Sequence, residues 1–89
     1  MSRTRKLLER LDSIPKDMTW DELRTLLLRL GFTESQGSGS RVAFHVPDEP
    51  SRTIRLHQPH NRNPPHVLAP YLRAVKAHLV EWGYYDDVD

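Results

Sequence analysis

The sequence predicts a single α+β domain, in which a three-stranded antiparallel sheet carries helices on one face (αβββα) and one extra helix precedes this core. Apolar residues recur at helical spacing near both ends of the chain, but at alternate positions between residues 32 and 57. Glycine- and proline-containing stretches separate the alternating segments. The 89 residues suffice for one small domain and not for two. We expect an N-terminal helical extension at 1–17, the core at 18–83 and a flexible acidic tail at 84–89.

Two helices are predicted before the sheet. The first is short and ends near Pro15. The second begins at a capping box, in which the Thr19 hydroxyl accepts from the Glu22 amide and the Glu22 carboxylate accepts from the Thr19 amide. Gly31 then supplies the left-handed residue that ends this helix. The predicted apolar faces are Leu7, Leu8, Leu11 and Ile14 in the first helix, and Leu23, Leu26, Leu27 and Leu30 in the second.

Three strands and a last helix follow. We expect strands at 32–36, 41–46 and 52–57, joined by turns at 37–40 and 47–51. The stretch QPHNRNPP after the third strand is too rich in proline for either regular structure, so it forms a loop. Pro70 fits the first turn of the last helix, and Gly83 ends it. The buried positions of this helix are Leu72, Val75, Leu79 and Trp82.

Side-chain alternation assigns the exposed face of the sheet. The apolar residues of the second and third strands must share the buried face, which fixes the parity of their pairing. Pairing Val46 with Arg52 across the turn satisfies this requirement. The register then predicts Val42 opposite Leu56 and Phe44 opposite Ile54 on the buried face, and Arg41 opposite His57, Ala43 opposite Arg55 and His45 opposite Thr53 on the exposed face.

The charge and composition limit the classes of function. Residues 36–80 contain six basic and two acidic side chains and all five histidines, which suits an anionic partner. Charge alone, however, favours the simpler interpretation that these side chains serve ordinary solubility. Cysteine is absent, so disulfides and thiolate metal sites are excluded. The spacing of His57, His60 and His66 fits no standard zinc site. We expect no metal or other cofactor, no membrane segment and a cytoplasmic protein.

The exposed face carries side chains of the types used to bind RNA and to cut it, although arginines and histidines on an exposed strand face are usually only solvated. Guanidinium groups hold phosphates by paired hydrogen bonds. Imidazole both takes and gives a proton near neutral pH. Metal-free RNA cleavage needs a base for the 2′-hydroxyl, an acid for the leaving oxygen and a cation for the developing charge. His66 and His78 are assigned structural roles.

The succession of motifs resembles the HicA family of bacterial toxins. The stretches TWDELRTLLLRLGF, GSGSRVAFH, IRLHQPH and LAPYLRAVKAHL carry the resemblance, which covers roughly residues 19–82. It implies a fold like the double-stranded RNA-binding domain and an endoribonuclease that cleaves mRNA. It also implies a HicB-type antitoxin as the protein partner.

One departure from the family concerns the catalytic histidine that follows a glycine-serine pair in its members. Here Gly39 and Ser40 are followed by Arg41, which carries charge but transfers no proton near neutral pH. His57 is the substitute candidate, and His60 is the next. The residues expected to contact RNA are Ser40, Arg41, His45, Arg52, Arg55 and Arg62.

This departure leaves two alternatives to a nuclease. The protein binds RNA without cutting it, or its basic face serves only to dock an acidic antitoxin. A test for RNA cleavage by the purified protein distinguishes the nuclease from both alternatives.

Overall fold

The computed structural model describes residues 2–86 and contains, within them, three helices and one three-stranded antiparallel sheet. The helices are α1 (Arg3–Asp12), α2 (Trp20–Arg29) and α3 (Ala69–Glu81). The strands β1 (Thr33–Gln36), β2 (Arg41–Val46) and β3 (Glu49–His57) lie in that order across the sheet. The predicted α+β class and the order of its elements are therefore confirmed.

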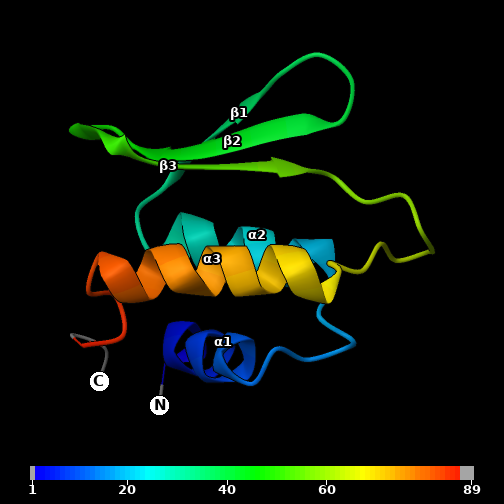
Figure 1. Cartoon of the computed structure of the whole chain (residues 1–89), viewed down its shortest axis with the longest axis horizontal. Helices are drawn as coiled ribbons and strands as arrows, with labels where there is room; N and C mark the ends of the chain where they lie inside the picture. Colours follow the sequence, from blue (N-terminus) through cyan, green and yellow to red (C-terminus); the bar gives the residue numbers. More distant parts are fainter. Residues whose placement is uncertain (1, 87–89) are drawn as a thin grey trace.

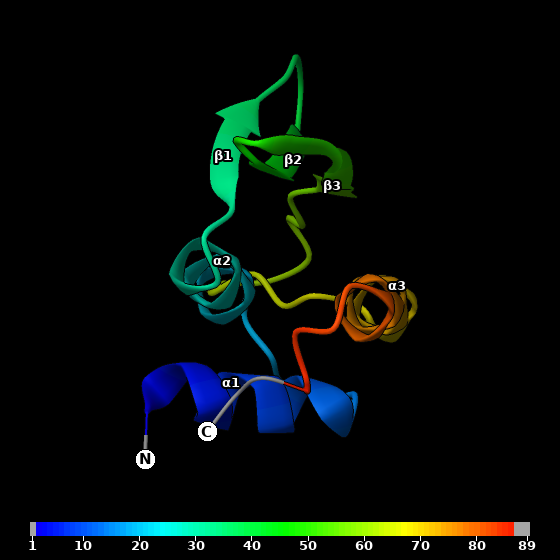
Figure 2. The same ribbon diagram turned by 90° about the vertical axis from the view of Figure 1, so that its left-hand side faces the viewer.

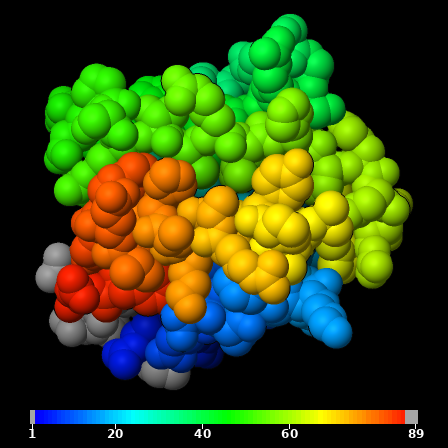
Figure 3. Space-filling view, in the orientation of Figure 1, coloured from blue at the N-terminus to red at the C-terminus, as the bar shows by residue number. Residues whose placement is uncertain are grey.

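The elements form three layers (Figures 1 and 2). The sheet is the first layer, α2 and α3 lie together beneath it, and α1 lies on their far side. The space-filling view shows the three layers in contact along one side of the molecule (Figure 3). The extra N-terminal helix does not cover the sheet. One face of the sheet is covered by α2 and α3, and the other face carries no helix of the described residues.

The core fills both spaces between the layers. Trp20 of α2 packs on Phe44 of β2, with ring centroids 6.1 Å apart. The buried apolar residues are Leu7, Leu8, Leu11, Met18, Trp20, Leu23, Leu26, Leu27, Phe32, Val42, Phe44, Ile54, Leu56, Val67, Leu72, Val75 and Leu79. Three of them belong to α1, which therefore extends the core instead of covering the sheet. None of the helices in residues 2–86 is both long and apolar enough to cross a membrane.

The ends of α2 follow the sequence signals. The Glu22 amide donates to the Thr19 hydroxyl at 3.1 Å, and the Thr19 amide donates to the Glu22 carboxylate at 2.9 Å. This reciprocal pair satisfies two amides that the first helical turn leaves without partners. Gly31 follows the helix at a φ of +100°, which a residue with a side chain rarely adopts. The predicted capping box and the glycine stop are both present.

The register of β2 on β3 agrees with the prediction except at one end. All five pairs expected from Arg41–His57 to His45–Thr53 are present. Val46, however, pairs with Glu49 and not with Arg52, because a bulge after His45 shifts the register. Strand β3 therefore begins at Glu49, and the prediction of a five-residue turn at 47–51 is wrong.

The segment after α3 packs against the domain as far as it is described. The Tyr84 ring lies 5.5 Å from that of Phe32, and the Tyr85 hydroxyl donates to the Leu8 carbonyl at 2.9 Å. Burial, helped by the negative charge of Asp12, raises the pKa of Tyr85 to about 12. The tail expected to be flexible, 84–89, includes both tyrosines, and these two residues pack on the domain. Residues 87–89 of the same tail lie outside the described range.

Replacing Leu11 with alanine tests whether α1 is part of the fold. Leu11 is fully buried between α1 and the α2–α3 layer. We expect Leu11→Ala to lower the free energy of unfolding by about 3 kcal/mol, since it removes buried methyl groups and leaves a cavity. Urea unfolding followed by circular dichroism measures this loss. Lys6→Ala, an exposed change in the same helix, should cost less than about 0.5 kcal/mol. Equal effects would show that α1 does not contribute to the core.

The ion pair between Arg10 and Glu22 makes stability depend on pH. Burial raises the pKa of Glu22, but hydrogen bonds from Arg10 and the Thr19 amide outweigh it, so the pKa lies below its ordinary value of 4.5. The unfolded chain therefore binds a proton more readily than the folded one. Stability should be fully present above pH 4.5 and fall as the pH drops through the lowered pKa.

Urea unfolding at several pH values between neutrality and pH 3 checks this dependence. Glu22→Gln should be less stable than the wild type at neutral pH and lose less on acidification. Glu81→Gln removes one exposed carboxylate from α3 and serves as the control. A slope for Glu22→Gln equal to that of the wild type would contradict the assignment.

Candidate nucleic-acid interface

Three rows of side chains cross the exposed face of the sheet. Residues directly opposite in an antiparallel pair have Cβ atoms about 5 Å apart, so each row forms a continuous strip. One row joins Arg41 of β2 to His57 of β3. The other two rows are Ser35, Ala43 and Arg55, and then Thr33, His45 and Thr53. Two arginines and two histidines thus lie on one surface, and the other side chains of these rows are small or short.

A hollow of about 460 Å³ lies at the Arg41–His57 end of this surface. Ser35 of β1 and Ala43 of β2 contribute to its lining. Their side chains are small and so leave space beside the longer side chains of Arg41 and Arg55. Arg41, Arg55 and His57 line the same hollow and are exposed. The sheet therefore offers a groove with two guanidinium groups and one imidazole around a shallow floor.

Arg41 is oriented by the turn between β1 and β2. Its Nη2 donates to the Ser38 hydroxyl at 2.7 Å, and its Nε donates to the Ser38 carbonyl at 3.4 Å. Guanidinium has five N–H donors, so others remain for an incoming anion. None of the ion pairs among the described residues involves Arg41, Arg55 or Arg62. Their charge is not neutralised by a neighbouring carboxylate of residues 2–86.

A serine and a histidine meet just beyond the Arg41–His57 pair. The Gln58 amide donates to the Ser40 carbonyl at 2.7 Å and so continues the β2–β3 ladder by one residue. The Ser40 hydroxyl lies 2.7 Å from Nε2 of His60, close enough for a hydrogen bond in either direction. This contact holds the imidazole of His60 next to the end of β3.

The proline-rich loop that carries His60 and Arg62 is fastened at its far end. The Asn61 side chain donates to the His66 carbonyl at 2.9 Å and accepts from the His66 amide at 3.1 Å. The start of α2 and the residues just before it add two backbone hydrogen bonds, from the Trp20 amide to the Pro65 carbonyl and from the Val67 amide to the Met18 carbonyl. The loop is thus tied to the rest of the domain without being helix or strand.

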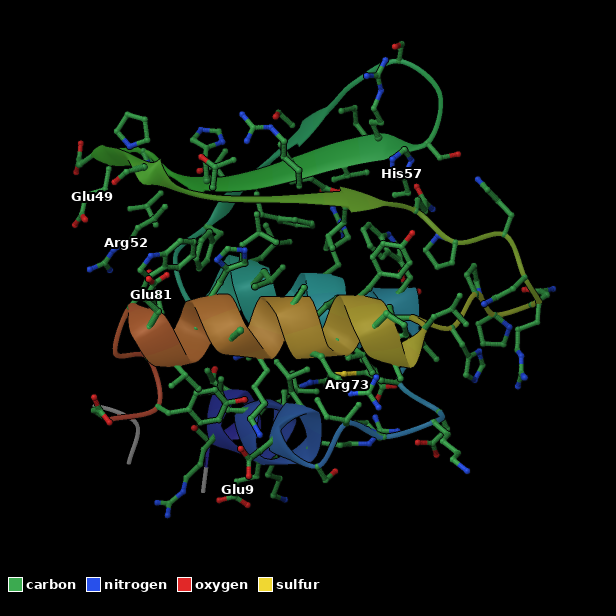
Figure 4. The ribbon with its side chains drawn as sticks, viewed as in Figure 1. Glu9, Glu49, Arg52, His57, Arg73 and Glu81 are labelled. Carbon is green, nitrogen blue, oxygen red and sulfur yellow. The ribbon has the colours of Figure 1, made fainter. Side chains whose placement is uncertain are left out.

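Three expected site residues lie apart from this groove. Arg52 occupies the helix side of the sheet, where it pairs with Glu49 at 3.1 Å and lies over the Tyr84 ring. Figure 4 places Arg52 and Glu49 at one end of the sheet and His57 at the other. His45 lies four residues along β2 from Arg41, roughly 13 Å at strand spacing. Arg62 is exposed on the loop.

The remaining histidines have structural contacts. Nδ1 of His66 lies 2.7 Å from the Pro64 carbonyl, and His78 stacks on Trp82 with ring centroids 5.1 Å apart. Within the described chain, no three histidine or carboxylate side chains are grouped so that they could hold a metal ion.

The contact between Ser40 and His60 was missed by the sequence analysis, which treated the two residues separately. The register contained a signal for it. Ser40 lies opposite Gln58, one step beyond the Arg41–His57 pair, and His60 follows Gln58 by two residues. Extending the predicted ladder by one residue would have brought the three together.

In comparisons with known proteins, no family model, no curated protein and no solved structure matches this chain. The resemblance to the HicA family therefore rests on the motifs of the sequence alone.

Replacing Asn61 with alanine tests how the loop is held. We expect Asn61→Ala to lower the free energy of unfolding by about 1 kcal/mol, because it removes two hydrogen bonds near the surface. Amide hydrogen exchange in residues 58–68 should become faster. Gln58→Ala is the matched control, since it shortens another amide side chain in the same loop and keeps the backbone bond to Ser40. Unchanged exchange in Asn61→Ala would show that other contacts hold the loop.

Proposed function

We propose that this protein is a HicA-like endoribonuclease that binds mRNA on the exposed face of its sheet and cuts it without a metal ion. The observation that supports the proposal is the placement of Arg41, Arg55 and His57 around one hollow on that face. Resemblance to the HicA family supplies the substrate class and the reaction. It also supplies a HicB-type antitoxin as inhibitor and the cytoplasm, where mRNA is translated, as the location.

The guanidinium groups have the first task, which is to hold the RNA backbone. Arg41 and Arg55 flank the hollow and donate to the non-bridging oxygens of one phosphate. The same donors stabilise the additional negative charge that this phosphate carries in the transition state. Contacts of this kind make the affinity fall as the salt concentration rises.

Two imidazoles have the second task, which is proton transfer. His57 and His60 line a common smaller hollow next to the groove. One of them takes the proton of the ribose 2′-hydroxyl, whose oxygen then attacks the adjacent phosphorus. The bond from phosphorus to the 5′-oxygen breaks, and the other imidazole gives that oxygen a proton. The products are a 2′,3′-cyclic phosphate and a free 5′-hydroxyl.

Ser40 has a positioning task in this scheme. Its hydroxyl is 2.7 Å from Nε2 of His60, and its carbonyl accepts from the Gln58 amide between the two histidines. Both contacts restrain the segment that carries the acid and the base. This role uses the serine of the glycine-serine pair, whereas the arginine that follows it acts on the phosphate.

Binding without cleavage is the second candidate function, and Arg41 favours it. The guanidinium group stands where the family has its catalytic histidine, and it cannot exchange protons near neutral pH. A protein that kept Arg41 and Arg55 without a working imidazole pair would still hold RNA, or an acidic antitoxin, on the same face.

Transcript cleavage by the purified protein tests the proposal. We expect His57→Ala and His60→Ala each to reduce the cleavage rate by roughly 100-fold or more, since each removes one proton-transfer group. RNA affinity should change little. Cleaved ends carrying a 2′,3′-cyclic phosphate, detected by mass spectrometry, identify the reaction.

His78→Ala is the matched control, because His78 stacks on Trp82 and faces neither hollow. It should cleave at the wild-type rate. Loss of cleavage in all three variants would point to unfolding, which circular dichroism detects. RNA binding by the wild type with no cleavage at any pH would favour the non-cutting alternative, and neither binding nor cleavage would reject both.

A further inference from the structure

A second hollow lies between the proline-rich loop and the start of α3. It has a volume of about 200 Å³ and is lined by residues of the loop together with Leu68 and Tyr71. This is smaller than the roughly 300–1,000 Å³ of sites for drug-sized ligands. Figure 3 shows the loop (yellow-green) against the first turn of α3 (yellow). The size suits one planar ring system.

The lining of this hollow combines polar side chains of the loop with apolar and aromatic ones, and two of the latter are exposed. Leu68 and Tyr71 are 54% and 41% exposed, and they are two of the few large apolar residues with that exposure among the described residues. Pro59 contributes a second ring, and Val67, which is 5% exposed, belongs to the core at the base. An aromatic ring such as that of Tyr71 provides a stacking surface for the face of a nucleobase, and the aliphatic ring of Pro59 adds an apolar contact.

His57 connects this hollow to the cationic groove. Among residues 2–86, it alone lines both hollows, with Arg41 and Arg55 in the groove and Tyr71 in the smaller one. A nucleotide that places its phosphate between the arginines therefore has room for its base on the other side of the imidazole. The hydrogen bonds of Asn61 and Ser40 hold the loop wall of the hollow in place.

We propose that the hollow lined by Tyr71, Leu68 and Pro59 is a nucleobase subsite that takes one unpaired base next to the phosphate held by Arg41 and Arg55. This inference rests on the proposed RNA-binding function and adds the form of the substrate. Bases inside a duplex are stacked and paired, so the subsite selects single-stranded RNA or an unpaired loop. In this mode the protein recognises an unpaired base, whereas double-stranded RNA-binding domains recognise the shape of a duplex.

Fluorescence anisotropy with an end-labelled oligouridylate tests the subsite. Stacking of one base on an aromatic side chain corresponds to about tenfold in affinity, so Tyr71→Ala should bind roughly tenfold more weakly. Tyr71→Phe keeps the ring and should bind like the wild type. Val80→Ala, an exposed apolar change near the other end of α3, should also leave binding unchanged. The dependence of affinity on salt should be the same in all four proteins, because no phosphate contact is altered.

Two further probes separate the base from the backbone. An abasic ribose-phosphate oligomer of the same length should bind the wild type and Tyr71→Ala equally. A hairpin with a fully paired stem should bind more weakly than oligouridylate. Three results would each overturn the subsite while leaving the RNA-binding face intact. The first is equal affinity of Tyr71→Ala and the wild type for oligouridylate, and the second is a loss of affinity in Tyr71→Ala that is as large on the abasic oligomer. The third is tighter binding of the duplex than of oligouridylate. A wild type that binds none of the probes would reject the proposed function, and with it the subsite.

Discussion

The pairing register of β2 on β3 is the constraint on which both the core and the exposed face depend. Val42 pairs with Leu56 and Phe44 with Ile54 on the face of the sheet that the helices cover. This pairing places Arg41 opposite His57 on the other face. A shift of one residue would expose the apolar set and bury the cations. The free energy of burying the apolar residues therefore also fixes which charged groups are neighbours at the candidate site.

The helix layers allow the other face of the sheet to remain uncovered. In a chain this short, the sheet and two helices bury a limited apolar area. α1 adds Leu7, Leu8 and Leu11 on the far side of α2 and α3, so further stability is gained without covering the strands. The Tyr85 hydroxyl and the Arg10–Glu22 ion pair fasten α1 to the segments on either side of it. The contacts of α1 that add stability and the uncovered face of the sheet thus lie on opposite sides of the molecule.

The sequence was sufficient to predict most of the fold because local signals and the apolar pattern agree. The capping box at Thr19, the stop at Gly31 and the alternation in β2 each depend on residues a few positions apart. The bulge after His45 was missed because alternation does not report an inserted residue. Arg52 was expected to contact RNA although parity puts it on the face of Ile54, and its contact with Tyr84 joins segments that no local pattern relates. The contacts of the proline-rich loop have no periodicity from which to predict them.

An arginine at position 41 changes which side chains the proposed mechanism uses for acid–base chemistry. A guanidinium group held by Ser38 stabilises charge but leaves the proton transfers to other side chains. The imidazoles close to it come from the end of β3 and from the loop, and the short segment between them is restrained by Ser40. In the proposed mechanism β2 supplies phosphate binding and the segment from His57 to His60 supplies proton transfer, and the same segment forms a wall of the smaller hollow. That mechanism requires an ordered loop as much as it requires the sheet, and the hydrogen bonds of Ser40 and Asn61 restrain the loop.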